Sequence, residues 1–79
     1  MEIHPSARRH GIADADMLHA VDHSMGVEHV GEDPDRWLVI GPDRTGNLVE
    51  VVVLATTEKR EILIHAMSMR AVYRKLLER

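Results

Sequence analysis

The stretch "RWLVIGPDRTGNLVEVVVLATTEKREILIHAM" (36–67) decides the fold of this 79-residue chain. It holds three runs rich in Val, Leu and Ile, at 36–41, 47–56 and 60–67, and such runs are typical of β-strands. "PDRTGN" between the first two predicts a hairpin loop, and "TEKR" predicts a second polar turn. Because consecutive strands with short links pair as neighbours, we predict an antiparallel meander.

Helical segments are expected on both sides of this region. "HPSARRHG" (4–11) predicts a short helical turn, because Pro suits the first helical position and Gly the residue past the end. A second helix is expected from about Asp14 to His23, and a third is expected to begin at Ser68, an acceptable N-cap. The third helix would place one apolar stripe on the sheet, formed by Met69, Val72, Tyr73 and Leu76.

These elements predict a single α+β domain over residues 1–79. We expect a small antiparallel sheet of three or four strands, with 25–31 as the weakest strand candidate. Two N-terminal helices and one C-terminal helix would pack against it. The chain has no Phe and one Trp, so aliphatic side chains must fill a modest core, and Trp37 is expected to matter for packing because no other side chain is as large.

The absence of cysteine narrows the chemistry. It excludes disulfides, thiolate metal sites and a catalytic thiol, and it favours the cytoplasm, because small secreted domains usually carry disulfides. The N-terminal stretch lacks an apolar signal core, and the longest apolar run, "VVVLA", is too short to span a membrane. We expect a cytoplasmic protein with no membrane partner and no cofactor.

Charge is distributed unevenly along the chain. Residues 1–35 contain eight acids and two bases, a balance of −6, whereas residues 36–79 contain eight bases and five acids, a balance of +3. This asymmetry suggests a polar partner for one half, or association between the halves in a homodimer. Chance distribution over a small surface is the alternative.

The segment "ARRHGI" (7–12) places two arginines beside a histidine. Arg8 and Arg9 could grip a phosphate while His10 moves a proton. The alternative is a polar helix end, where His and Arg offset the helix dipole.

A second candidate site follows the last predicted strand, where His65 precedes Arg70 and Tyr73. Metal-independent cleavage of RNA needs a base for the 2′-OH, donors for charge on phosphorus and an acid for the leaving oxygen. These three residues could supply all of this together with residues 8–10. The alternative is a half-buried, hydrogen-bonded histidine, with the tyrosine packed at the rim of the core.

His19 and His23 lie four residues apart on the second predicted helix, with both imidazoles on one face, as a metal site requires. No HExxH glutamate follows the first histidine, and a third ligand would have to come from elsewhere. We therefore expect solvated histidines here and no metal site.

Four motifs, in this order, resemble a known family. They are "RRHGI" (8–12), "EDPDRWLVIG" (32–41), "GNLVEVVVLATTEKREILI" (46–64) and "HAMSMRAVYRKL" (65–76), and they span nearly the whole chain. The chain resembles a divergent member of the BrnT-like toxins, which belong to the wider RelE-like ribonuclease fold. The resemblance implies the toxin of a type II toxin–antitoxin system, which cleaves RNA and is inhibited by an antitoxin protein.

At positions that match the family motifs, the resemblance points to Arg9, His10, His65 and Arg70 as active-site residues. The sequence hypothesis therefore has two sets of residues. The expected catalytic residues are His65, His10, Arg70 and Tyr73, and the expected RNA-binding residues are Arg8, Arg9, Arg70 and Arg74. The competing hypothesis is a non-catalytic interaction module, because a net charge of −3 gives little general attraction to RNA.

Overall fold

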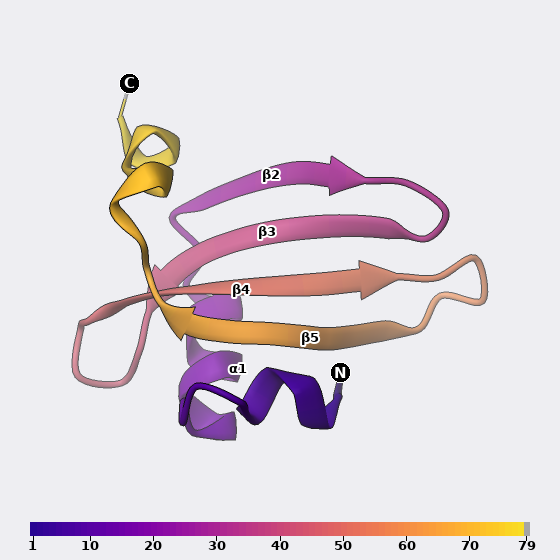
Figure 1. Ribbon diagram of the computed structural model, residues 1–79, viewed down its shortest axis with the longest axis horizontal. Helices are drawn as coiled ribbons and strands as arrows, with labels where there is room; N and C mark the ends of the chain where they lie inside the picture. Colours follow the sequence, from indigo (N-terminus) through magenta and orange to yellow (C-terminus); the bar gives the residue numbers. More distant parts are fainter. Residues whose placement is uncertain (79) are drawn as a thin grey trace.

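The computed structural model describes residues 1–78, which form a five-stranded mixed sheet in the order β1-β5-β4-β3-β2 (Figure 1). The strands are β1 (Glu2–Ile3), β2 (Gly26–Gly31), β3 (Asp35–Pro42), β4 (Leu48–Ala55) and β5 (Glu61–Ser68). Among these residues α1 (Asp14–Asp22) is the only α-helix. The two other helical segments, η1 (Pro5–Arg8) and η2 (Ala71–Leu77), are 3-10 helices.

The predicted meander is confirmed, because β2, β3, β4 and β5 pair as consecutive antiparallel neighbours. Both predicted turns are present. Gly46 adopts a positive φ of 92° in the β3–β4 turn, and Lys59 adopts 63° in the β4–β5 turn. The apolar runs therefore form strands, and the polar stretches between them reverse the chain.

The predicted fold class is nevertheless wrong, because the sheet is neither purely antiparallel nor limited to three or four strands. β1 adds a parallel edge, with Glu2 opposite Ile62 and Ile3 opposite Leu63. A two-residue strand has no periodicity of its own to detect. Its pairing is decided by residues sixty positions later in the chain, so no local pattern predicts it.

The expected set of three helices is also wrong, because only the middle one, which α1 confirms, is an α-helix. β5 continues through Ser68, where a helix was expected to begin, and η2 contains no buried residue. Val72, which was expected to pack on the sheet, is 71% exposed. Most helical stability in proteins comes from packing of an apolar face, and η2 receives little of it. η1 is likewise a single short 3-10 segment.

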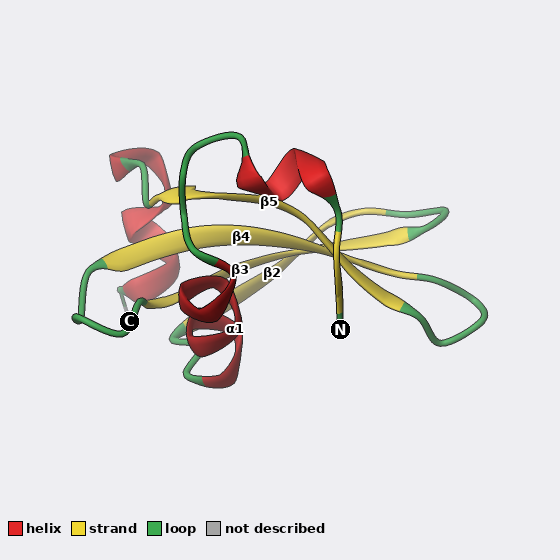
Figure 2. Cartoon of the chain, turned by 90° about the horizontal axis from the view of Figure 1, so that it is seen from below, coloured by secondary structure: helices red, strands yellow, loops and turns green. Residues whose placement is uncertain are grey.

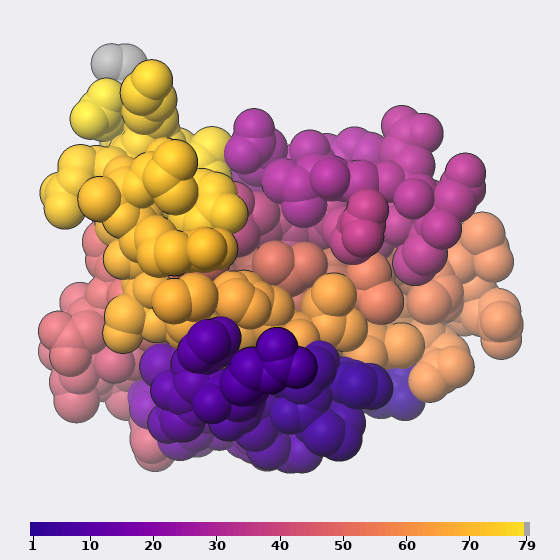
Figure 3. Space-filling view, viewed as in Figure 1, coloured from indigo at the N-terminus to yellow at the C-terminus, as the bar shows by residue number. Residues whose placement is uncertain are grey.

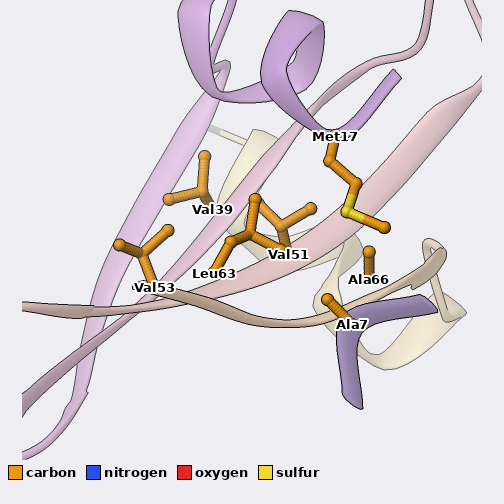
Figure 4. Close-up of a cluster of buried hydrophobic side chains, with 7 residues drawn as sticks. All are labelled: Ala7, Met17, Val39, Val51, Val53, Leu63 and Ala66. Carbon is orange, nitrogen blue, oxygen red and sulfur yellow. The ribbon is translucent and has the colours of Figure 1, made fainter. Parts of the chain in front are cut away.

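The core lies between α1 and the face of the sheet that α1 covers, and η1 packs against β5 at the edge of the sheet (Figures 2 and 4). α1 packs closely on β3: a Cβ atom at Gly41 would collide with the carbonyl oxygen of Ala20. Only glycine therefore permits this approach. The buried cluster consists of Ala7, Met17, Val39, Val51, Val53, Leu63 and Ala66.

A bulge in β5 changes which side chains face the core. Val52 pairs with His65 but Val53 pairs with Leu63, so Ile64 is an extra residue. The bulge breaks the regular alternation of a strand, which would put Leu63 and His65 on one face. Leu63 is buried in the core, and His65 lies on the opposite face of the sheet.

Trp37 lies at the surface and does not fill the core. Its side chain is 38% exposed and lies against the imidazole of His29, with ring centroids 4.8 Å apart. Met17, Ile40 and Leu63 are among the largest fully buried side chains. Aliphatic residues thus fill the interior, and the only tryptophan remains at the surface.

Candidate functional site

A buried carboxylate lies on the face of the sheet opposite the core. Glu50, in β4, is 0% exposed, and its neighbours in the strand, Val49 and Val51, are apolar and also buried. It lies between Ile40 of β3 and Met67 of β5. A buried charge is tolerated only when it is paired and hydrogen-bonded, so its partners define the site.

Two residues supply four hydrogen bonds to Glu50. Arg70 donates from its backbone N–H at 2.9 Å and from Nε at 3.0 Å to Oε1, and from Nη2 at 2.8 Å to Oε2. His65 donates from Nε2 to Oε2 at 3.1 Å. Burial by itself raises the pKa of Glu50, but the hydrogen bonds from Arg70 and His65 outweigh it and leave the pKa below its usual range. Glu50 is therefore ionised at neutral pH.

The hydrogen bond from Nε2 of His65 to Glu50 fixes the tautomer of His65. An ionised carboxylate only accepts hydrogen bonds, so Nε2 of the imidazole must carry the hydrogen. In the neutral ring the lone pair is then on Nδ1, which has no hydrogen-bond partner among residues 1–78. The side chain is 28% exposed, so part of the imidazole is accessible to solvent.

Two further predicted catalytic residues join this group. The ring of His10, from the loop between η1 and α1, meets His65 edge-on, with centroids 5.7 Å apart. The hydroxyl of Tyr73 accepts from Nη2 of Arg70 at 3.3 Å, and the guanidinium lies 5.3 Å from the tyrosine ring centroid. We call Glu50, His65, Arg70, Tyr73 and His10 the Glu50 cluster.

Three distant parts of the chain meet at the Glu50 cluster. In the space-filling view the N-terminal segment (indigo) and the C-terminal segment (yellow) lie on either side of β5 (orange) (Figure 3). The structure thus brings together all four predicted catalytic residues, although they come from two separate motifs of the sequence.

The predicted RNA-binding arginines differ in their availability. Arg8 forms a two-point ion pair with Asp14, with Nη2 2.8 Å from the carboxylate, so binding a phosphate would disturb that pair. Arg70 is engaged through Nε and Nη2, which leaves Nη1 for a ligand. Arg9 and Arg74 are exposed and form no ion pair with any described residue.

Glu50 was missed in the sequence reading. Its signal was present: it is the only charged residue between Leu48 and Ala55, in a run long enough to be a central strand. A charge at such a position is almost never buried without a partner. The sequence could have indicated a buried ion pair, but it could not have named Arg70 and His65 as the partners.

His19 and His23 stack on each other, with ring centroids 4.1 Å apart. Nδ1 of His19 donates to the carbonyl of Pro42 at 2.8 Å, and Nδ1 of His23 donates to the carbonyl of His19 at 2.9 Å. No group of three or more metal-ligating side chains occurs within residues 1–78. This pair would therefore provide only two ligands from the described chain.

Ion pairs within the chain neutralise part of the charge difference between its acidic and basic halves. Nε of Arg44 lies 2.8 Å from Asp16, and Nη2 of Arg60 lies 2.8 Å from Glu2. Each of these pairs joins the basic half to the acidic half. Only the remaining exposed charges are free to meet a partner.

No protein-family model, curated protein or solved structure matches the chain. None of the helices in residues 1–78 has the length and apolarity needed to cross a membrane.

Proposed function

We propose that this protein is a metal-independent endoribonuclease, a cytoplasmic toxin similar to the BrnT-like family and silenced by an antitoxin protein. One observation carries the proposal: two imidazoles, His10 and His65, lie with ring centroids 5.7 Å apart, and a buried carboxylate orients one of them. Two positioned imidazoles are suited to remove one proton and deliver another in the same reaction.

In the proposed reaction, Nδ1 of His65 takes the proton from a ribose 2′-OH. The 2′ oxygen attacks the adjacent phosphorus as the bond from phosphorus to the 5′ oxygen breaks. Protonated His10 gives its proton to that leaving oxygen, and a 2′,3′-cyclic phosphate remains. Glu50 holds the ring of His65 and compensates the charge that the ring gains, as the carboxylate of a catalytic triad does.

Cationic and hydroxyl groups beside the imidazoles support this assignment. Arg9 is adjacent to His10 in sequence and has no ion-pair partner among the described residues. Nη1 of Arg70 and the hydroxyl of Tyr73 lie at the same cluster. Donors of this kind stabilise the charge that develops on the phosphoryl oxygens.

The test uses purified protein, a labelled single-stranded RNA and a chelator. We expect cleavage that persists in the chelator, yields 2′,3′-cyclic phosphate ends and fails where the cleavage position carries a 2′-deoxyribose. His10→Ala and His65→Ala should each reduce the rate by about 10²–10⁴-fold. His23→Ala, which changes the exposed histidine at the C-terminal cap of α1, is the matched control and should keep full activity. Uncut RNA, or equal rates in all variants, would refute the proposal.

The toxin assignment needs a separate experiment in cells. Expression of the chain should arrest growth, whereas the double variant His10→Ala/His65→Ala should not. A small neighbouring gene that encodes a DNA-binding protein should relieve the arrest when it is co-expressed. Equal growth arrest by the wild type and the double variant would refute the role of the imidazoles.

The second candidate function is a non-catalytic interaction module. It is favoured by exposed apolar side chains at one edge of the sheet, among them Val27 and Val30, which are 52% and 47% exposed. Absence of RNA cleavage by the folded protein, together with association that depends on salt, would favour this function over the ribonuclease.

A further inference from the structure

β2 forms a long open edge of the sheet. β2 is the end strand of the sheet, and its four central residues, 27–30, are exposed. The opposite end strand, β1, has only two residues. An end strand presents unpaired backbone N–H and C=O groups, which are a template for pairing with another strand.

The same edge exposes apolar surface. Met25, Val27, Val30 and Trp37 are 58%, 52%, 47% and 38% exposed. Val27 and Trp37 also line a groove of about 270 Å³ beside α1. Exposed apolar groups that gather in this way mark interaction surfaces, whereas isolated ones need no explanation.

Opposite charges lie at the two ends of β2. At its start, η2 packs on the strand, with the carbonyl oxygen of Leu76 3.0 Å from where a Cβ at Gly26 would lie. η2 carries Arg74 and Lys75, both exposed. At the other end lies the β2–β3 turn (Figure 1). This turn carries Glu32 and Asp33, which are also exposed. Six residues of strand span about 20 Å, which exceeds the Debye length of about 8 Å at physiological salt, so the two ends act separately.

We propose that β2 pairs antiparallel with β2 of a second copy of this chain. A two-fold axis through the middle of the paired strands joins the two sheets into one. It also places the basic η2 of each copy beside the acidic β2–β3 turn of the other, so the favourable contact occurs twice. A parallel arrangement would bring like charges together at both ends. This charge arrangement selects a second copy as the occupant, whether or not the Glu50 cluster cleaves RNA.

The experiment measures the mass of the full chain by light scattering and sedimentation at low and high salt. We expect a species of twice 8.9 kDa that dissociates more readily at high salt. Val27→Lys, which adds a charge to the exposed edge, should give the monomer. Leu18→Lys, at a 39% exposed position on α1, is the matched control and should remain dimeric. Circular dichroism confirms that each variant is folded.

A charge exchange tests the direction of pairing. Lys75→Glu and Glu32→Lys should each raise the dissociation constant about fivefold, because each weakens two symmetric contacts. The combination of both should restore the affinity, because the new charges meet across the interface. A monomer at every concentration, or a dimer unaffected by Val27→Lys, would overturn the proposal. Failure of the combined variant to recover would overturn the antiparallel arrangement.

Discussion

Removal of the arginine that holds Glu50 should destabilise the fold markedly. In Arg70→Ala the carboxylate of Glu50, which is 0% exposed in the wild type, loses both hydrogen bonds from the Arg70 side chain and keeps the one from His65. Breaking a fully buried ion pair costs about 3–5 kcal/mol. The Arg70 side chain is 52% exposed, so water can replace part of the lost interaction, and we expect about 2 kcal/mol. For a domain of this size the melting temperature should fall by about 8–16 °C.

The destabilisation should shrink in acid. The pKa of Glu50 lies below its ordinary value of 4.5, so its contribution to wild-type stability is present above that value and is lost as the pH falls through the folded-state pKa. In Arg70→Ala the same burial is opposed by fewer hydrogen bonds, so the pKa of the carboxyl rises. Protonation therefore removes the buried negative charge of the variant at a higher pH than in the wild type. The difference in unfolding free energy should therefore be smaller at about pH 4 than at pH 7.

The assay is urea unfolding followed by circular dichroism at both pH values. A companion variant, Glu50→Leu/Arg70→Ala, removes the buried unpaired charge and keeps a side chain of similar volume at position 50. It should be more stable than Arg70→Ala alone, because an apolar residue needs no partner. An Arg70→Ala penalty that is equal at both pH values, or a double variant at least as unstable as the single one, would refute the reasoning.

Three further predictions concern positions away from the Glu50 cluster. Gly41→Ala should cost about 3 kcal/mol or more, measured by urea unfolding, because the new methyl group would collide with the backbone of Ala20; a change below about 1 kcal/mol would contradict the close packing. Gly46→Ala, with open space around the residue but a φ of 92°, should cost only about 1 kcal/mol from backbone strain, and a loss as large as at Gly41 would show that strain had been underestimated. Titration calorimetry with zinc should give no saturable heat, because His19 and His23 supply two ligands and zinc sites use three or four protein ligands; stoichiometric binding abolished by His23→Ala would contradict this.

The strands were largely predictable because each carries its own local signal. The runs at 36–41, 47–56 and 60–67 are rich in aliphatic residues and bounded by turn sequences, and the observed strands β3, β4 and β5 differ from them by one residue at each end. The α-helix at Asp14–Asp22 was likewise expected, to within one residue. Local propensity and burial agree in these segments, so the pattern is sufficient.

The candidate site was only partly predictable. His65 and Arg70 drew attention because packing does not require them at the end of a strand, and His10 because two arginines precede it. Their meeting depends on the bulge at Ile64, which turns His65 to the face that carries Glu50. A single inserted residue of this kind cannot be detected from the hydrophobic pattern, because the segment remains extended and apolar on both sides of it.

The sequence by itself determined the strands, the turns between them and the aliphatic character of the core. The tertiary structure alone decided the parallel pairing of β1 with β5, the 3-10 geometry of η2 and the burial of Glu50 between His65 and Arg70. The physical reason is the distance along the chain over which each effect acts. Propensity and alternation act over a few residues, whereas these three features depend on contacts between segments that only folding brings together.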